Sequence, residues 1–323
     1  MTELQESSNS ASAKIFVDFD LSPSYTPLLI FRNLRDDSVS TINLEYGKTL
    51  VWKTGESRYC VGYHVKDEYH HYEPCPSKSI VEKGIQCSRC KNKDLLFPCM
   101  ICNGSECINI KSMWNVCEVT PTSVYITFFG DMMKVGVSKK DRLLKRWIEQ
   151  GADYASEIAV APNGLIAREI ESAVSKEFEV TKGVRIQKKL KSISIQNERL
   201  FEDTTNPEQS IKKEYNNRVK TIAEWIMHKY GETLAVKEPI IRDLQQFYGL
   251  AFKGSVSRLN SIDDLHGHFA GMKGALFCLE MQNRLCVFDI RELRGKISEI
   301  EIASDHNNAV SITSQRSITD FFG

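Results

Sequence analysis

Two Cys-x-x-Cys pairs are the strongest chemical signal in this sequence. Cys87 and Cys90 form the first pair, and Cys99 and Cys102 follow after eight residues. Each pair can present two thiolates to one tetrahedral ion, for which zinc is the usual metal. In a reducing cytoplasm such pairs are ligands rather than disulfides, and four thiolates leave no coordination position for a substrate. The spacing therefore predicts a structural zinc site, with Cys107 as an alternative ligand.

Other metal-ligand types lie just upstream of these pairs. His64, His70, His71 and Cys75 fall close together, and Cys60 precedes them. Tyrosines surround them, and a proline-flanked loop follows. We interpret these residues as part of the surface rather than as a metal site.

A tyrosine and a lysine share one face of a predicted β-hairpin. The Gly-Asp pair at residues 130–131 lies between two alternating apolar runs, which is a recognised two-residue hairpin connection. This turn places Tyr125 opposite Gly136 and Thr127 opposite Lys134. The phenol then lies over a glycine, with open space beside it.

Two arginines follow on a predicted helix. Ser138, with Asp141 three residues later, has the pattern of a capping box, and Gly151 is a typical C-terminal stop. Arg142 and Arg146 lie one turn apart on this helix.

A second helix, expected at residues 165–178, carries two acids. A buried stripe that includes Ile170 is flanked by Glu169 and Glu171. Each acid lies about 100° from Ile170 around the helix, so position alone does not choose between them.

These motifs resemble the GIY-YIG nuclease fold, and they are most similar to an uncharacterised prokaryotic domain family related to it. The resemblance covers roughly residues 58–294. It is carried by Val124-Tyr125-Ile126, residues 134–138, Lys145-Arg146-Trp147 and Ile170-Glu171. The first motif's glycine is Ser123 here, and the second motif's tyrosine is Lys134.

The resemblance implies metal-dependent phosphodiester cleavage. In this family Tyr125 would help to activate water, and Arg146, with Arg142 beside it, would bind phosphate. Glu171 would hold one Mg²⁺ or Mn²⁺ ion that neutralises charge on the scissile phosphate. Lys134 would contact phosphate, since its ordinary pKa of about 10.4 makes it a poor base.

The total charge of the chain predicts no polyanionic partner, because 42 basic residues balance 42 acidic ones. The local distribution of charge, however, does indicate such a partner. Residues 134–146 carry six basic residues against one acid, and residues 181–191 carry five against none. Lys139, Lys140 and Lys145 are therefore candidate contacts to DNA, with RNA as a possible substitute.

The C-terminal residues fit a peptide that binds the PCNA sliding clamp. From residue 304 the chain turns polar and cannot form a core. Gln315, Ile318, Phe321 and Phe322 then match the PIP box, in which one helical turn gathers the apolar side chains into a plug. The alternative is a terminal strand whose phenylalanines pack on their own domain.

The patterns together predict an α+β protein with small antiparallel sheets, helices, a GIY-YIG-like core and a zinc knuckle insert. Its first 13 residues are polar rather than a signal peptide, and no apolar run approaches the ~20 residues of a membrane helix. We expect a cytoplasmic protein without a membrane partner. The expected order is a disordered leader (1–13), an N-terminal β-rich domain (14–84), a zinc knuckle (85–117), the core (118–200), a helical plus β domain (201–303) and a flexible tail (304–323). Within the helical plus β domain, one helix is expected from Pro207, after Asn206 as its cap, to Tyr230, and a shorter one from Pro239 to Tyr248.

The favoured function is that of a PCNA-associated, metal-dependent DNA endonuclease in replication or repair. A non-catalytic DNA- or RNA-binding adaptor is the alternative, since Ser123 and Lys134 depart from the nuclease motif. An inhibitor that occupies the clamp groove is a third possibility.

Overall fold

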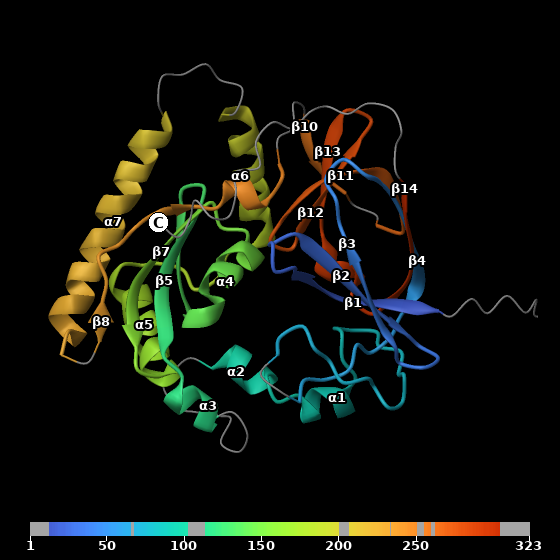
Figure 1. Ribbon diagram of the computed structural model, residues 1–323, viewed down its shortest axis with the longest axis horizontal. Helices are drawn as coiled ribbons and strands as arrows, with labels where there is room; N and C mark the ends of the chain where they lie inside the picture. Colours follow the sequence, from blue (N-terminus) through green and yellow to red (C-terminus); the bar gives the residue numbers. More distant parts are fainter. Residues whose placement is uncertain are drawn as a thin grey trace, which may run out of the picture.

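A computed structural model of the chain describes residues 13–65, 68–102, 114–199, 207–232, 234–250, 255–259 and 262–303. Cys107 and the four predicted clamp-binding residues, Gln315, Ile318, Phe321 and Phe322, lie outside these ranges. Within them, two mostly antiparallel sheets and seven α-helices confirm the α+β class (Figure 1). No helix in this part of the chain is both long and apolar enough to cross a membrane.

The larger sheet has nine strands in the order β10-β13-β12-β11-β4-β14-β1-β2-β3, of which only the β10–β13 pair is parallel. Its apolar side chains form one core around Trp52, Phe31 and Phe277. The strands are β1 Lys14–Leu21, β2 Pro27–Asn33, β3 Val39–Asn43, β4 Thr49–Arg58, β10 Ser255–Arg258, β11 Asp264–Lys273, β12 Leu276–Met281, β13 Arg284–Asp289 and β14 Lys296–Ala303.

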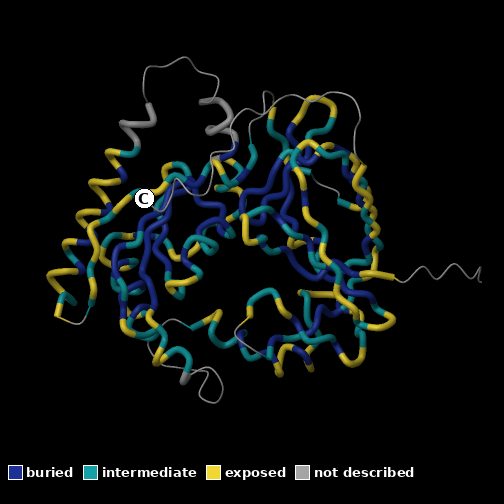
Figure 2. Tube along the Cα trace, in the orientation of Figure 1, coloured by how far each residue is buried: buried dark blue, intermediate teal, exposed yellow. Residues whose placement is uncertain are grey.

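The smaller sheet has five strands, and helices cover both of its faces. Its order is β6-β5-β7-β8, with β9 also paired to β7. The strands are β5 Thr122–Phe129, β6 Met132–Lys139, β7 Tyr154–Ala161, β8 Ala235–Val236 and β9 Arg242–Asp243. Figure 2 shows that the buried residues follow the strands of both sheets.

Alternation along β5 decides which helix meets which face. Val124 and Ile126 point to one face, where they pack with α5 (Gly164–Glu177) and α7 (Pro207–Tyr230). Tyr125 points to the other face, where it packs with α4 (Leu143–Gln150). In Figure 1, α4 accordingly lies between the smaller and the larger sheet.

The remaining helices are short or lie outside the smaller sheet. They are α1 Ser88–Lys93, α2 Phe97–Ile101, α3 Trp114–Val119 and α6 Ile186–Arg199, with 3₁₀ turns η1 Lys140–Arg142, η2 Gln245–Phe247 and η3 Ile290–Leu293. Helices α1, α2 and α3 lie along one edge of the molecule, beneath the two sheets in Figure 1.

The end of α4 joins the two sheets. Gly151 ends this helix in the left-handed conformation (φ 71°), as predicted, and a Cβ atom there would lie 2.7 Å from the carbonyl oxygen of Lys273 in β11. The ammonium of Lys273 forms a buried ion pair with Asp153, and the Tyr248 hydroxyl donates to the carbonyl of Ala152 at 2.6 Å. Close backbone approach and paired buried charges therefore fix α4 against the larger sheet.

The predicted hairpin is confirmed in its register, whereas two helix predictions are wrong. Tyr125 pairs with Gly136 and Thr127 with Lys134. The helix after the hairpin begins at Leu143, because residues 138–139 still pair with β5 and no capping side chain forms a hydrogen bond. The helix predicted from residue 239 to 248 is instead β9, which pairs with β7, followed by η2.

One long-range pairing differs from the separate β-rich regions expected from the sequence. Strand β4 lies between β11 and β14, and β1 pairs with β14. The β strands of the N-terminal and C-terminal regions therefore form a single sheet around one core.

Candidate functional site

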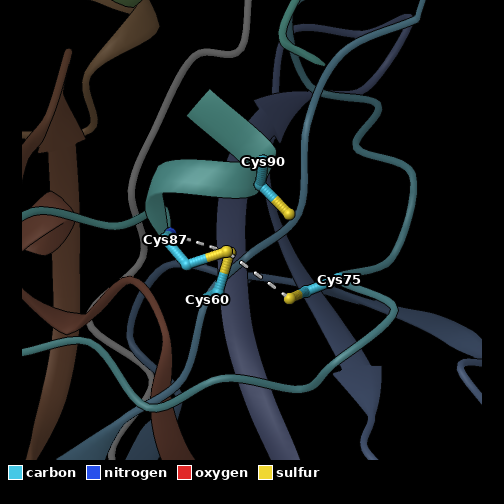
Figure 3. Close-up of side chains that lie close together, drawn as sticks. All are labelled: Cys60, Cys75, Cys87 and Cys90. Atoms are coloured by element: carbon cyan, nitrogen blue, oxygen red, sulfur yellow. Dashed lines mark hydrogen bonds between the residues drawn. The ribbon is translucent and has the colours of Figure 1, made fainter. Parts of the chain in front are cut away.

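Four cysteine sulfurs lie close enough together to hold one metal ion. Cys60, Cys75, Cys87 and Cys90 have Sγ atoms within 4.8 Å of one another, and those of Cys75 and Cys87 are 3.9 Å apart. Figure 3 shows the four side chains converging from the end of β4, a loop and helix α1. Zinc–sulfur bonds of about 2.3 Å in a tetrahedron place sulfurs about 3.8 Å apart, so these residues fit a Cys₄ ion.

The local backbone holds this cluster in place. Cys87 immediately precedes α1 in an extended conformation, which points its N–H at the sulfur of Cys60 at 3.2 Å, and Cys90 lies one turn further on. Arg32 in β2 anchors the incoming loop by donating to the carbonyls of Val61, at 2.7 Å, and Tyr72. The cluster is therefore tied to the larger sheet.

Two of the four thiols, Cys60 and Cys75, have pKa values shifted in opposite directions. Burial raises the pKa of Cys60 to about 11, although the backbone N–H of Cys87 acts in the opposite direction. Burial also opposes ionisation of Cys75, but the N–H groups of Ser79 and Ser77 outweigh it and lower that pKa to about 6. A bound cation would favour the thiolate at every position, because a metal binds thiolates rather than thiols.

The cluster contains only half of the predicted ligand set. Cys87 and Cys90 are in it, but Cys99, in α2, and Cys102, directly after α2, are not. The carboxylate of Asp94 turns the chain between α1 and α2, because it accepts from the N–H groups of Leu96 and Phe97 at 3.0 Å.

Cys60 and Cys75, which the sequence placed on the surface, are buried here and take the other two positions. Their spacing shows no ligand motif. The only available signal was the number of cysteines between residues 60 and 102.

The Tyr125 face of the smaller sheet contains a buried lysine. A Cβ atom on Gly136 would lie 2.5 Å from the Tyr125 hydroxyl and 2.8 Å from the Lys134 ammonium, so both polar groups lie above this glycine. The expected space beside the phenol is therefore filled by Lys134. Its ammonium is 5.4 Å from the centre of the Tyr125 ring and donates to the carbonyl of Val135 at 3.2 Å.

Lys134 has no carboxylate partner within the part of the chain that the structure describes. The residue is 9% exposed. Burying an ammonium costs free energy unless an opposite charge compensates for it. This lysine therefore marks a place where an anion would be stabilised.

Further cations surround the same place. Lys189 of α6 donates to the carbonyl of Gln150 at 2.6 Å. Burial, together with the positive charges of Arg291, Lys134 and Arg146 and despite Asp289, lowers the pKa of Lys189 to about 7. Burial is the largest cause of this shift, and the basic neighbours add to it.

Arg146 and Gln150 connect Tyr125 to helix α4. Gln150 donates to the Tyr125 hydroxyl at 2.9 Å. Burial lowers the pKa of Arg146, but Tyr125 and Glu149 outweigh this effect and hold it above its ordinary value. The Arg146 side chain is still 41% exposed, so it can reach a bound anion.

Glu149 is a functional candidate that sequence reasoning missed. Its carboxylate accepts from Arg142 at 2.9 and 3.0 Å, and Arg146 lies 3.8 Å away. His70 contacts it at 3.2 Å. Burial raises the pKa of Glu149, but His70 and Arg142 outweigh burial and hold it below its ordinary value.

His70 and Tyr69 bring the loop before Cys75 to α4. The Arg142 guanidinium stacks on the Tyr69 ring, 4.4 Å from its centre. Burial lowers the pKa of His70, but hydrogen bonds to Asp18 and Glu149 outweigh it and raise the pKa to about 9. This histidine, which was also assigned to the surface, is only 18% exposed.

The structure does not bring Glu171 together with Arg142 and Arg146. Glu171 is buried on α5, which covers the face opposite Tyr125, and it pairs with Arg168 at 3.2 Å. Arg168 also donates to the carbonyl of Cys99 at 3.4 Å. The carboxylate beside Arg142 and Arg146 is Glu149 instead.

The predicted nucleic-acid contacts lie in different surroundings. Lys139 ends β6, and Lys140 begins η1 in an exposed position. Lys145 pairs with Asp20 at 2.5 Å and thereby links α4 to β1.

Comparison with known proteins gives one family. Searches among curated proteins and among solved structures find no match. The family described as "Protein of unknown function (DUF2797)" matches residues 47–297, which include the cysteine cluster, the smaller sheet and most of the larger one. The chain therefore belongs to the DUF2797 family.

Proposed function

We propose that this protein binds nucleic acid by holding a backbone phosphate at the Tyr125 face of the smaller sheet. The observation that carries the proposal is the buried ammonium of Lys134, which has no carboxylate partner in the described residues. A phosphate oxygen would supply the missing charge and a hydrogen-bond acceptor.

The neighbouring cations support a phosphate rather than a carboxylate ligand. Lys189 and Arg291 come from elements outside the smaller sheet, and Arg146 comes from α4. Arg291 also pairs with Asp289 and Arg146 with Glu149, whereas Lys134 has no carboxylate partner in the described residues. A polyanion spreads several charges along the surface, and each contact releases condensed counterions.

The sequence motif at Gln315, Ile318, Phe321 and Phe322 supports recruitment to the PCNA clamp. In this proposal the tail brings the protein to DNA during replication or repair, and the Cys₄ cluster holds a structural zinc ion. Substitution of Phe321 and Phe322 by Ala should abolish clamp binding without changing affinity for free DNA.

Fluorescence anisotropy with single-stranded and duplex oligonucleotides tests the phosphate site. Lys134→Met should weaken binding about tenfold and lower the slope of affinity against salt by about 1, because one phosphate contact is lost. Lys220→Met, on the exposed side of α7, is the matched control and should behave as wild type. Unchanged binding by a folded Lys134→Met protein would disprove this site.

Metal-dependent phosphodiester cleavage is the second candidate function. The observation that favours it is the position of Arg146 between Tyr125 and a carboxylate, Glu149. Cleavage of end-labelled DNA with Mg²⁺ or Mn²⁺, compared between wild type and Tyr125→Phe, tests it directly. Binding without cleavage would leave the adaptor function.

A further inference from the structure

Three metal-ligand groups from separate elements converge beside α4. The Nε2 atom of His70 lies 3.5 Å from an oxygen of Asp20 in β1 and 3.2 Å from an oxygen of Glu149 in α4. All three ligand atoms are within 4.8 Å of one another. One imidazole N–H can satisfy one acceptor well, whereas here two carboxylate oxygens face the same nitrogen.

The other nitrogen of His70 has the partner expected of a metal ligand. Its Nδ1 atom lies 3.2 Å from the carboxylate of Asp18, which is buried and forms an ion pair with Arg294. Metal-bound histidines usually donate their second N–H to a carboxylate, because that bond fixes the ring orientation and the tautomer. Asp18 would fix His70 with Nε2 directed at Asp20 and Glu149.

Basic side chains also contact the two carboxylates, at the same oxygens that face His70. Lys145 contacts Asp20 at 2.5 Å, and Arg142 donates to both oxygens of Glu149. Ligating carboxylates typically carry such additional hydrogen bonds. The side chains of His70 and Asp20 are 18% and 24% exposed, so an ion can reach them from solvent.

We propose that Asp20, His70 and Glu149 bind one divalent first-row cation such as Mn²⁺, in place of the proton on His70 Nε2. One nitrogen and two carboxylate oxygens suit this class of ion, and three protein ligands leave coordination positions open. Because Arg146 lies between Glu149 and Tyr125, an open position is suited to a second phosphate oxygen. This last step rests on the proposed function, whereas metal binding itself does not.

Mn²⁺ titration followed by electron paramagnetic resonance tests the site in the full-length, zinc-loaded protein without nucleic acid. Mn²⁺ competes poorly for thiolates, so the loss of free signal reports on nitrogen and oxygen ligands. Wild type should bind one Mn²⁺, and His70→Gln and Asp20→Asn should each raise the dissociation constant at least about tenfold. His71→Gln and Asp36→Asn, which replace exposed residues of the same types, should bind as wild type.

Circular dichroism and thermal melting establish that each variant is folded. Asp20→Asn changes a partly exposed residue and keeps the test valid if His70→Gln does not fold. Absence of Mn²⁺ binding to wild type at millimolar concentration, or full binding by both folded variants, would overturn the proposal. Oligonucleotide binding is measured separately without Mn²⁺, so failure of the phosphate site is distinguishable from failure of the metal site.

Discussion

Replacing Cys75 by Ser should remove a substantial part of the free energy of unfolding. An ion on the cluster closes one loop of about 15 residues from Cys60 to Cys75 and another of about 12 from Cys75 to Cys87. By analogy with a disulfide, closing a loop of this length stabilises by about 3 kcal/mol. The loss is therefore about 3 kcal/mol if the ion stays on three ligands, and about 6 kcal/mol if it dissociates.

This magnitude is large against the roughly 5–15 kcal/mol that stabilises a typical domain. The effect should be local first, because α1 is the one helix among the described residues 59–65 and 68–96, and no strand lies in them. Hydrogen exchange should accelerate there, while β11 to β13, which belong to the core around Trp52 and Phe277, should stay protected.

Metal content and thermal melting of four single variants separate the two possible ligand sets. Cys60→Ser and Cys75→Ser should lose zinc and melt at lower temperature. Cys99→Ser and Cys102→Ser should retain both zinc and stability. The opposite pattern, with zinc lost on substitution of Cys99 or Cys102 and retained on substitution of Cys75, would refute the cluster seen in the structure.

Two further predictions concern the Tyr125 face. Because Lys189 loses its proton near pH 7, oligonucleotide affinity should fall as the pH rises from about 6 to about 8. The charged groups around it are Arg291, Lys134, Arg146 and Asp289. In the Lys189→Gln variant, oligonucleotide affinity measured by anisotropy should not change with pH over this range. If the variant kept the pH dependence of wild type, Lys189 would not be its cause. Gly136→Ala places a methyl group 2.5 Å from the Tyr125 hydroxyl and 2.8 Å from the Lys134 ammonium. It should cost roughly 1–3 kcal/mol in chemical denaturation and weaken oligonucleotide binding, and a variant as stable as wild type would show that the two groups move aside freely.

Local patterns allowed the hairpin at residues 122–139 to be predicted in full register. The Gly-Asp turn fixes the pairing, and the alternation of apolar residues then assigns each side chain to a face. The predicted stop at Gly151 and the helix from Pro207 to Tyr230 also depended on nearby residues alone. These features need no information about distant parts of the chain.

Features that depend on distant pairing were not predictable. Alternation identifies β4 as a strand, but nothing local indicates that its neighbours are β11 and β14. Ser138 has the sequence of a helix cap and yet remains in β6, because pairing with Ser123 outweighs the local preference. Helix α6 was not predicted at all, since its basic run suggested only a charged surface.

The candidate sites show the same division. Tyr125 and Lys134 were placed together correctly by register, whereas Glu149 became visible only through its contacts with Arg142 and His70. Arg142 directly precedes α4 and Glu149 lies in its last turn, seven residues further on, so part of this contact follows from helical geometry. The contact between Glu149 and His70 does not follow from helical geometry, because His70 lies on a separate loop near the cysteine cluster.

That loop connects the two candidate sites physically. Tyr69 and His70 lie between Cys60 and Cys75, so an ion on the cysteines holds both ends of the segment that contacts Arg142 and Glu149. If the ion were lost, the segment could move away and His70 would release Glu149, which could then pair more closely with Arg146. A structural metal would in this way affect the arginines without contacting them. The part of the chain that matches the DUF2797 family includes both the cysteine cluster and the smaller sheet.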